Sequence, residues 1–391
     1  MLKKLTGLFI LTFTLLSTLH SFAQESPFKG ASDLFINKDG DLDYLSPWLY
    51  LRQNESTFDK NMYMQAYATY ASFLGETHHL KGPKLKPEHL ESYEFINPFK
   101  AIMPKAQEAS LLILNEAHHV PSHRAFALSM LDSLQKAGYS VLSLEGLSYE
   151  DKGLNERGYP IASSGFYTRE PLFANFIRAA ILKGFKVVGH EIKPEQEIEL
   201  NDWIARSNHR DSIQAVNLLS ILQKYPDQKV FAYVGYDHVL EKARGKFKRM
   251  ATYLKEAGID ALTIDQEMHC ECDADLLKAP AVLTKDGQGP ITTGSRMGFV
   301  DLQVIHSITD RGDLKGWLSA YTGYKEKKIS IPKKHQSNRL LVQVYDKKEF
   351  TQSGDKAIPV YQGISHGNGS QLKVAIPSFT KDVTVQFTPV K

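Results

Sequence analysis

The sequence predicts an α/β protein: a mostly parallel sheet with helices on both faces, a helical N-terminal extension and a small C-terminal antiparallel β module. Two observations support this fold class. From residue 110 to residue 268, short apolar runs alternate with helical patterns, as expected for right-handed crossovers around a parallel sheet. After about residue 278, turn-rich segments separate short alternating runs, which indicates antiparallel strands.

The expected elements of the central region have well-marked ends. Gly138, Gly184, Pro226 and Gly258 follow the four helical patterns, and glycine and proline commonly stand where helices stop. In chain order the elements are strand 110–114, helix 122–137, strand 139–144, helix 170–183, strand 186–189, helix 196–223, strand 229–235, helix 244–257 and strand 260–264.

The flanking segments have different patterns. Residues 58–74 carry tyrosine, methionine and phenylalanine at roughly helical spacing, which favours packing against a core over ligand binding. Short alternating runs follow later at 339–345, 357–362, 371–376 and 383–388. We therefore expect a signal peptide at 1–23, a helical lead-in packed on the core at 24–100, an α/β domain at 101–278 and a β-rich module at 279–391.

The first residues have the features of an export signal. Lys3 and Lys4 precede the apolar run 8–16, and residues 21–23 have the small-x-small pattern of a cleavage site. No later apolar run reaches the roughly 18 residues that cross a bilayer. We expect cleavage after Ala23 and an exported protein, periplasmic or secreted, without a transmembrane segment.

Charge and cysteine content limit the partners. The chain has 47 Lys and Arg against 44 Asp and Glu, and no basic run interleaved with aromatics of the kind that holds nucleic acid. Cys270 and Cys272 are too close in sequence to cross-link distant elements. With His269 they lack the second ligand pair typical of structural zinc sites. The expected partner is a small-molecule or peptide substrate, and not nucleic acid.

Carboxylate or imidazole side chains stand at the ends of five successive predicted strands. The run L-L-I-L-N-E-A-H-H places Glu116, His118 and His119 directly after the first strand. Parallel strands end at one edge of a sheet, where such folds bind ligands. The sequence therefore predicts one polar cleft. The other strand-end residues are Glu145, then His190 and Glu191, then Asp237 and His238, and finally Asp265, Glu267 and His269.

Several of these residues have an alternative structural role. A histidine at a strand end is often a hydrogen-bonded scaffold residue, which is the alternative for His190 and His238. Burial raises the pKa of Glu145 unless a cation lies beside it. A salt bridge from Glu145 to Arg124 or Arg210 is the alternative to a role as general base or metal ligand.

Only one of the two adjacent histidines is expected to face the cleft. Glu116 and His118 are two residues apart, so in an extended chain they point to the same side. His119 points the other way until the chain turns into the following helix. The pattern alone does not choose between them.

Short motifs follow one another in a recognisable order between residues 110 and 268. Residues 115–119 read N-E-A-H-H, Glu145 ends the next strand, and His238 ends a later one in Gly-Tyr-Asp-His. In these features the region resembles the superfamily of erythromycin esterases, ChaN-like haem-binding proteins and TraB/Tiki-like proteins. Those proteins share a strand-end G-E-x-H or G-E-x-x-H, a glutamate at the next strand end and a late strand-end histidine.

Two further stretches fit the same resemblance. R-D-x-x-Q-A-x-N, which begins at Arg210, is similar to the R-[DE]-x-x-M-A-x-N stretch of the esterases. Arg124, five residues after His119, suits an esterase-like arginine. Asn115 stands where the superfamily usually has glycine.

We expect a hydrolase that activates water for attack on an ester- or amide-type carbonyl. His119 or His118 would accept the proton from water, oriented by Glu116 or Glu145. His238 would serve as a second acid or base, or bind the developing oxyanion with an arginine. No Gly-x-Ser-x-Gly elbow stands beside a strand, so no serine nucleophile is expected. The candidate catalytic residues are Glu116, His118, His119, Glu145 and His238, and the candidate substrate-binding residues are Arg124, His190, Glu191, Arg210 and Tyr236.

The resemblance leaves the cofactor open, because the superfamily has metal-dependent and metal-free members. An alternative function is non-enzymatic binding of haem or another iron ligand, as in ChaN-like proteins. A third interpretation is a degenerate scaffold that makes contacts through its β module. Candidate zinc or manganese ligands are Glu116, His118, Glu145 and His238, and candidate axial haem ligands are Tyr236, His238, His118 and His190.

Overall fold

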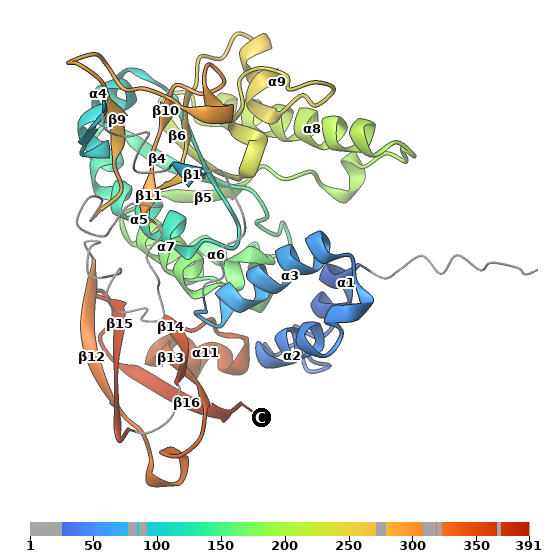
Figure 1. Cartoon of the computed structure of the whole chain (residues 1–391), viewed down its shortest axis with the longest axis vertical. Helices are drawn as coiled ribbons and strands as arrows, with labels where there is room; N and C mark the ends of the chain where they lie inside the picture. Colours follow the sequence, from blue (N-terminus) through green and yellow to red (C-terminus); the bar gives the residue numbers. More distant parts are fainter. Residues whose placement is uncertain are drawn as a thin grey trace, which may run out of the picture.

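The α/β fold class is confirmed. The computed structural model has a six-stranded parallel sheet flanked by helices, with small antiparallel sheets towards the C-terminus (Figure 1). No helix in the described part of the chain is long and apolar enough to cross a membrane. The predicted signal segment and the side chains of Cys270 and Cys272 lie outside that part. The structure describes residues 26–76, 84–85, 92–270, 279–307, 318, 323–365 and 369–390.

The central sheet has the strand order β10-β7-β3-β6-β4-β5, and its neighbouring strands run parallel. β3 is buried along its whole length, as expected where helices cover both faces. β10 lies beyond residue 278, where we expected the β-rich module to begin, and it pairs with β7. The strand bounds are β3 Leu111–Glu116, β4 Tyr139–Leu144, β5 Lys186–Gly189, β6 Lys229–Gly235, β7 Leu262–Asp265 and β10 Leu302–Gln303.

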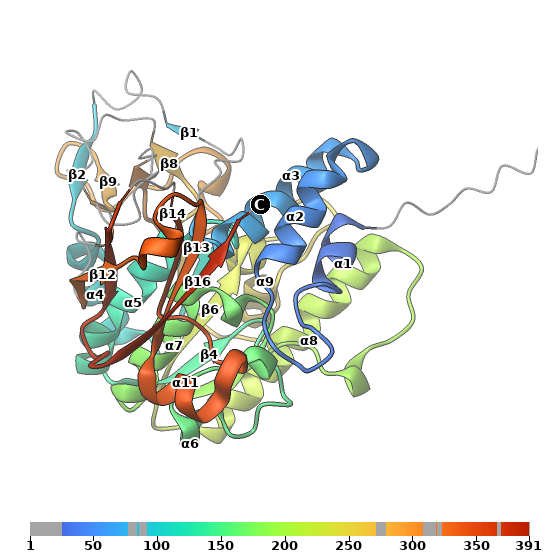
Figure 2. The same cartoon turned by 90° about the horizontal axis from the view of Figure 1, so that it is seen from below.

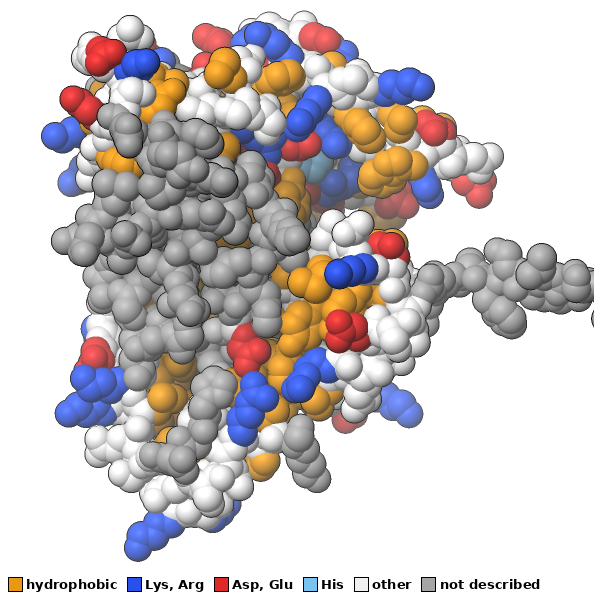
Figure 3. All heavy atoms as spheres, in the orientation of Figure 1, with side chains coloured by type: hydrophobic (Ala, Val, Ile, Leu, Met, Phe, Trp, Pro, Cys, Tyr) orange, Lys and Arg blue, Asp and Glu red, His pale blue; other side chains and the backbone are white. Residues whose placement is uncertain are grey.

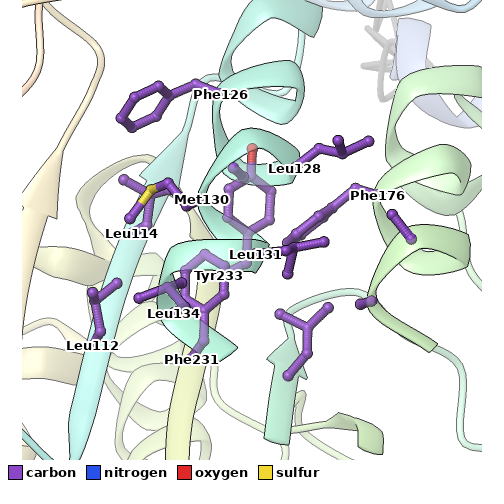
Figure 4. Close-up of a cluster of buried hydrophobic side chains, with 14 of the residues drawn as sticks. Leu112, Leu114, Phe126, Leu128, Met130, Leu131, Leu134, Phe176, Phe231 and Tyr233 are labelled. Atoms are coloured by element: carbon purple, nitrogen blue, oxygen red, sulfur yellow. The ribbon is translucent and has the colours of Figure 1, made fainter. Parts of the chain in front are cut away.

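Each face of the sheet has its own core, because alternate residues of a strand point to opposite faces. On β3, Leu112 and Leu114 pack with α4, α5 and α7 (Figure 4). Leu111 and Ile113 pack with α8 and α9 on the other face. Burying one such side chain contributes about 1.5 to 3 kcal/mol. The helix bounds are α4 Pro98–Glu108, α5 Pro121–Lys136, α7 Pro171–Leu182, α8 Trp203–Lys224 and α9 Met250–Glu256.

β3 and β6 are neighbours in the sheet, and the connections that follow them cross opposite faces of it. The chain leaves β3 through α5 on one face and reaches β4. It leaves β6 through α9 on the opposite face and reaches β7, on the other side of β3. Such a divergence opens a crevice at the carboxyl ends of the two strands, where open α/β sheets bind ligands. The residues that end β3 and β6 therefore occupy the position expected of a site.

Two helices begin later than their sequence patterns predict. α8 begins at Trp203 and not near residue 196. The Asp202 side chain caps it by accepting a hydrogen bond from the N–H of Ala205 (2.8 Å). α9 begins six residues late, after a turn in which Gly245 takes a left-handed conformation (φ 62°).

The N-terminal helices form a unit with its own aromatic core. Phe35, Tyr70 and Phe73 pack against one another in stacked and edge-to-face contacts. Phe166, from the connection between β4 and α7, inserts beside them with ring centroids 5.5 to 5.9 Å away. This connection therefore joins the helical unit to the edge of the sheet. The helices are α1 Pro27–Ser32, α2 Leu45–Gln53 and α3 Lys60–Phe73.

The C-terminal part consists of two small antiparallel sheets, β12-β15 and β14-β13-β16, that share one apolar core. A buried ion pair joins it to the α/β part. Figure 2 shows the ribbons of the two helices that carry this pair, α7 and α11. Arg178 of α7 donates to Glu349 of α11 (2.6 Å) and to the carbonyl of Ile358 (2.7 Å). The bounds are β12 Tyr324–Ser330, β13 Leu340–Asp346, α11 Lys347–Ser353, β14 Tyr361–Ser365, β15 Gln371–Pro377 and β16 Val383–Pro389.

Short strands form two more sheets beside the main one. β1 and β11 pair with β8 in parallel, and β2 pairs with β9 in antiparallel fashion. A short helix, α6, lies in the connection that follows β4. Their bounds are β1 Lys84–Leu85, β2 Glu94–Ile96, α6 Leu154–Arg157, β8 His269–Cys270, β9 Val282–Thr284 and β11 His306–Ser307.

Candidate functional site

The carboxyl ends of β3, β4 and β6 bring predicted site residues together. Glu116 ends β3, Glu145 follows β4, and His238 lies in the 3₁₀ helix Tyr236–Val239 after β6. Nε2 of His238 lies 3.4 Å from Oε1 of Glu145. Figure 3 shows a hollow between α8 and α3, with a histidine and basic side chains in its depth. Residues from three strand ends thus form one site.

Glu116 is a buried carboxylate with several donors. Arg124 of α5 donates two hydrogen bonds to it, each of 2.7 Å, and the hydroxyl of Tyr233 donates another (2.9 Å). Burial alone would raise the pKa of Glu116, but Arg124 and His118 lower it to about 2. The carboxylate is therefore ionised and fixed in orientation at neutral pH.

Arg124 is completely buried and directs its donors to protein groups. Besides Glu116, it donates to Glu170 (3.0 Å) and to the carbonyl of His118 (2.9 Å). Because the guanidinium has no exposed surface, it orients Glu116 from behind and does not reach into the hollow.

The ring of His118 is held by three neighbours. Its Nδ1 lies 2.8 Å from Oε1 of Glu116. The ring stacks on Tyr167 with a centroid distance of 3.8 Å, and Tyr236 meets it edge-on at 4.9 Å. Since Glu116 is ionised, it accepts a hydrogen bond from the Nδ1–H of His118. In the neutral ring, Nε2 is then the nitrogen with the free lone pair.

Gly235, the last residue of β6, makes room for two of these groups. A Cβ atom at this position would lie 2.5 Å from Nε2 of His118 and 3.2 Å from Oε2 of Glu145. The N–H of Gly235 donates to Oε2 of Glu145 (2.5 Å). Nε2 of His118 and the carboxylate of Glu145 therefore meet beside a backbone position that only glycine can occupy without displacement.

Glu145 lies between Gly235 and Arg210 of α8, which donates to its Oε1 (2.6 Å). Arg210 also pairs with Glu191. Burial would raise the pKa of Glu145, but His238 and Arg210 hold it well below its ordinary value. The side chain of Arg210 remains 38% exposed, so this guanidinium is accessible from the hollow.

His238 forms a second imidazole–carboxylate pair. Its Nδ1 lies 2.6 Å from Oδ1 of Asp211, an oxygen that also accepts from the N–H of Met250 (2.7 Å). Arg249 lies 3.3 Å from the other oxygen of Asp211. Burial lowers the pKa of His238, but Glu145 and Asp211 raise it above its ordinary value. The pair therefore favours a protonated His238.

Tyr236 follows β6 with a left-handed backbone (φ 42°), a strained conformation for a bulky residue. The Nδ2 of Asn115 donates to the carbonyl of Tyr236 and to Asp265, each at 2.8 Å, and so ties together the ends of β3, β6 and β7. The hydroxyl of Tyr236 lies 3.3 Å from Nδ1 of His119. Burial lowers the pKa of His119 to about 3. His119 is thus a neutral ring with a phenol partner.

His190 and Glu191 support the site from the end of β5. His190 is completely buried, its Nδ1 lies 2.8 Å from the hydroxyl of Ser143, and burial lowers its pKa to about 4. The carboxylate of Glu191 pairs with Arg210 and accepts from Gln214 (3.2 Å). These contacts fix the position of Arg210.

The candidate metal ligands are already engaged. The oxygens of Glu116 accept from Arg124, and those of Glu145 accept from Arg210 and Gly235. A divalent cation would have to displace a guanidinium at each carboxylate. Within the residues that the structure describes, no group of three His, Cys, Asp or Glu side chains is arranged to hold a metal ion. This arrangement therefore does not fit zinc or manganese.

The remaining strand-end acids gather around one arginine beside Tyr236. Arg296 is paired with Asp237 (2.6 Å), Asp265 (3.0 Å) and Glu267. Burial and Asp265 raise the pKa of Glu267 to about 8. One guanidinium does not balance the charge of three carboxylates, so Glu267 retains its proton at neutral pH.

Four residues of the site were missed from the sequence: Tyr167, Glu170, Asp211 and Tyr233. Asp211 directly follows Arg210, and Tyr233 precedes Gly235 by two positions on a strand, so each had a usable signal. Tyr167 and Glu170 lie in the long connection between β4 and α7, whose path no local pattern determines.

Comparison with known proteins finds only distant similarity. No family model matches the chain, and no curated protein matches it. Solved structures that are similar to the chain at low TM-score include a type III effector, a haem-binding protein and part of a toxin. The type III effector HopBA1 has a TM-score of 0.33 and 11% identity over 56% of this chain and 98% of that one. ChaN of Campylobacter jejuni, described with cofacial haem binding, has a TM-score of 0.31 and 10% identity over 47% of this chain and 93% of that one. The C-terminal region of Pasteurella multocida toxin, described with a thiol-protease-like triad, has a TM-score of 0.29 and 11% identity over 54% of this chain and 26% of that one.

Proposed function

We propose that this protein is a hydrolase that cleaves an ester- or amide-type carbonyl with two imidazoles held by carboxylates. One observation carries the proposal. His118 and His238 each have Nδ1 bound to a buried carboxylate, Glu116 or Asp211, and each has Nε2 close to Glu145. Two oriented imidazoles around one cleft are the components of acid–base catalysis.

His118 is the proposed base. Glu116 accepts from Nδ1–H and stabilises the imidazolium that forms when Nε2 takes a proton from water. The water oxygen then bonds to the carbonyl carbon. His119 lacks this arrangement because its Nδ1 contacts the hydroxyl of Tyr236. General-base catalysis of this kind contributes about 10² to 10⁴ in rate.

His238 is the proposed acid. Glu145 and Asp211 raise its pKa, so it carries a proton to give to the leaving oxygen or nitrogen. Arg210, which is partly exposed and lies 3.2 Å from Nε2 of His238, is placed to stabilise the developing oxyanion. Arg124 is assigned a positioning role through Glu116. The predicted export signal would place this activity outside the cytoplasm.

The alternative is reversible haem binding. It is favoured by Tyr236, which is 37% exposed and has its hydroxyl beside His119, so that this pair could offer an axial ligand. His118 fits that role less well, because Tyr167 covers its ring.

The decisive experiment compares two glycine-to-alanine variants on a panel of aryl esters and anilides. Gly235→Ala places a methyl group against Nε2 of His118 and should reduce hydrolysis by about 10²-fold or more. Gly289→Ala is the matched control, because no atom lies within 4 Å of the added Cβ. Full activity in folded Gly235→Ala would contradict the proposal. No hydrolysis by the unmodified protein, with a Soret band after haem addition, would favour the alternative.

A further inference from the structure

The first turns of α8 project beyond the sheet. α8 has 22 residues and is therefore about 33 Å long, whereas β6, with seven residues, spans about 23 Å. A helix that connects parallel strands runs antiparallel to them. Arg210 of α8 pairs with Glu145 and Glu191, which follow the carboxyl ends of β4 and β5, so the helical turns before Arg210 lie beyond that edge of the sheet. In the space-filling view of Figure 3, the hollow that contains the site lies below this end of α8, the helix labelled in the same orientation in Figure 1.

The face of α8 that looks into the hollow carries an exposed tryptophan. Arg210 and Gln214 identify this face, because both contact Glu191. Trp203 lies seven residues before Arg210, two turns along the same face. It is 63% exposed, and Ile198, in the segment just before the helix, is 56% exposed. Figure 3 shows hydrophobic side chains gathered over this end of α8, next to the hollow.

We propose that Trp203 and Ile198 form a subsite for the apolar part of the substrate. The inference rests on the proposed function and adds the substrate class: an ester or amide with an extended apolar acyl chain. Trp203 lies about 10 Å along the helix axis from Arg210, so a chain of about eight carbons spans from the reacting carbonyl to the indole. Covering an exposed indole with such a chain removes apolar surface from water, which favours binding.

The catalytic test uses 4-nitrophenyl esters of increasing acyl length. Trp203→Ala should raise KM for the octanoate by about 10-fold or more, leave KM for the acetate unchanged and leave kcat unchanged for both. Val216→Ala is the matched control, because Val216 is an exposed apolar residue (51%) on the opposite face of the same helix. A KM in the unmodified protein that does not fall with acyl length would overturn the proposal.

A binding test separates the subsite from the chemistry. Octanamide is titrated calorimetrically into the full-length protein and both variants. Binding that is lost in Trp203→Ala and retained in Val216→Ala supports the subsite even if no ester is hydrolysed, in which case the proposed function alone fails. Equal affinity in all three proteins, or equal loss in both variants, rejects the subsite.

Discussion

Nδ1 of His238 lies 2.6 Å from Oδ1 of Asp211, a residue of α8 that is 27 positions earlier in the chain. The N–H of Met250 fixes the same oxygen, so the carboxylate cannot turn away from the imidazole. The pair joins the helix before β6 to the turn after it. Together with Glu145, this contact raises the pKa of His238 above its ordinary value.

Removal of the charge of Asp211 should lower the pKa of His238. Asp211→Asn keeps the shape of the side chain but no longer stabilises the imidazolium, so His238 loses its proton at lower pH than in the unmodified protein. Activity that depends on protonated His238 should fall on the alkaline side at correspondingly lower pH. Histidine-labelled NMR titration would measure the pKa directly. An unchanged titration of His238 would show that Asp211 does not set its protonation.

Glu116→Gln should destabilise the protein by about 3 to 5 kcal/mol at neutral pH, because the completely buried Arg124 loses the carboxylate that accepts two of its hydrogen bonds and keeps a charged partner only at Glu170. The pKa of Glu116 is about 2 in the fold against 4.5 for the free group. Its ionised form therefore stabilises the fold above about pH 4.5, and this contribution is lost as the pH falls towards 2.

The free energies of unfolding of the two proteins should therefore converge in acid. Urea unfolding at several pH values measures this difference. A difference in the free energy of unfolding that stays constant between pH 7 and pH 3 would argue against a depressed pKa at Glu116.

Glu145→Gln separates a catalytic role from a structural one. Arg210 retains Glu191 as a partner, so the loss of charge at Glu145 should change the melting temperature little. Hydrolysis should fall sharply, because Glu145 then no longer raises the pKa of His238, the proposed acid. Activity per folded molecule and thermal unfolding are measured on the same preparation. A strongly destabilised variant with normal activity per folded molecule would assign Glu145 to the scaffold.

Asn115→Gly introduces the residue expected from the superfamily resemblance and should cost about 2 to 4 kcal/mol, because buried hydrogen bonds to Tyr236 and Asp265 are lost. When Tyr236 is also replaced by glycine, Asn115→Gly should lower the free energy of unfolding by less. Glycine adopts the left-handed turn without strain, so the turn depends less on the hydrogen bond from Asn115. A double-mutant cycle by chemical unfolding measures the coupling. Strict additivity would show that Asn115 does not hold this turn.

The parts of the fold that could be predicted are those set by local patterns. Buried apolar strands and helix-stopping residues predicted the parallel sheet, and its topology predicted that Glu116, Glu145 and His238 would meet. The late start of α8 was not predicted, because it depends on the Asp202 cap within a continuous helical pattern.

The internal partners of the site could not be predicted, because they depend on three-dimensional packing. The sequence allowed Glu145 to pair with either arginine, and only the position of α8 decides for Arg210. The proposal of His118 over His119 rests on the space beside Gly235 and on the stack with Tyr167, neither of which the sequence shows. Tyr167 in turn is placed by Phe166 among the aromatic rings of the N-terminal helices.

The most direct test of the proposed mechanism is kcat for an accepted aryl ester in His118→Ala and His119→Ala, measured side by side at neutral pH. His118→Ala should lose about 10²-fold or more, because the base held by Glu116 is gone. His119→Ala should retain activity within a few-fold. The hydrogen-bond partner described for its ring is the hydroxyl of Tyr236, and no carboxylate of the described residues holds it as Glu116 holds His118. The reverse order, or small and equal losses in both variants, would contradict the assignment of His118 as the base.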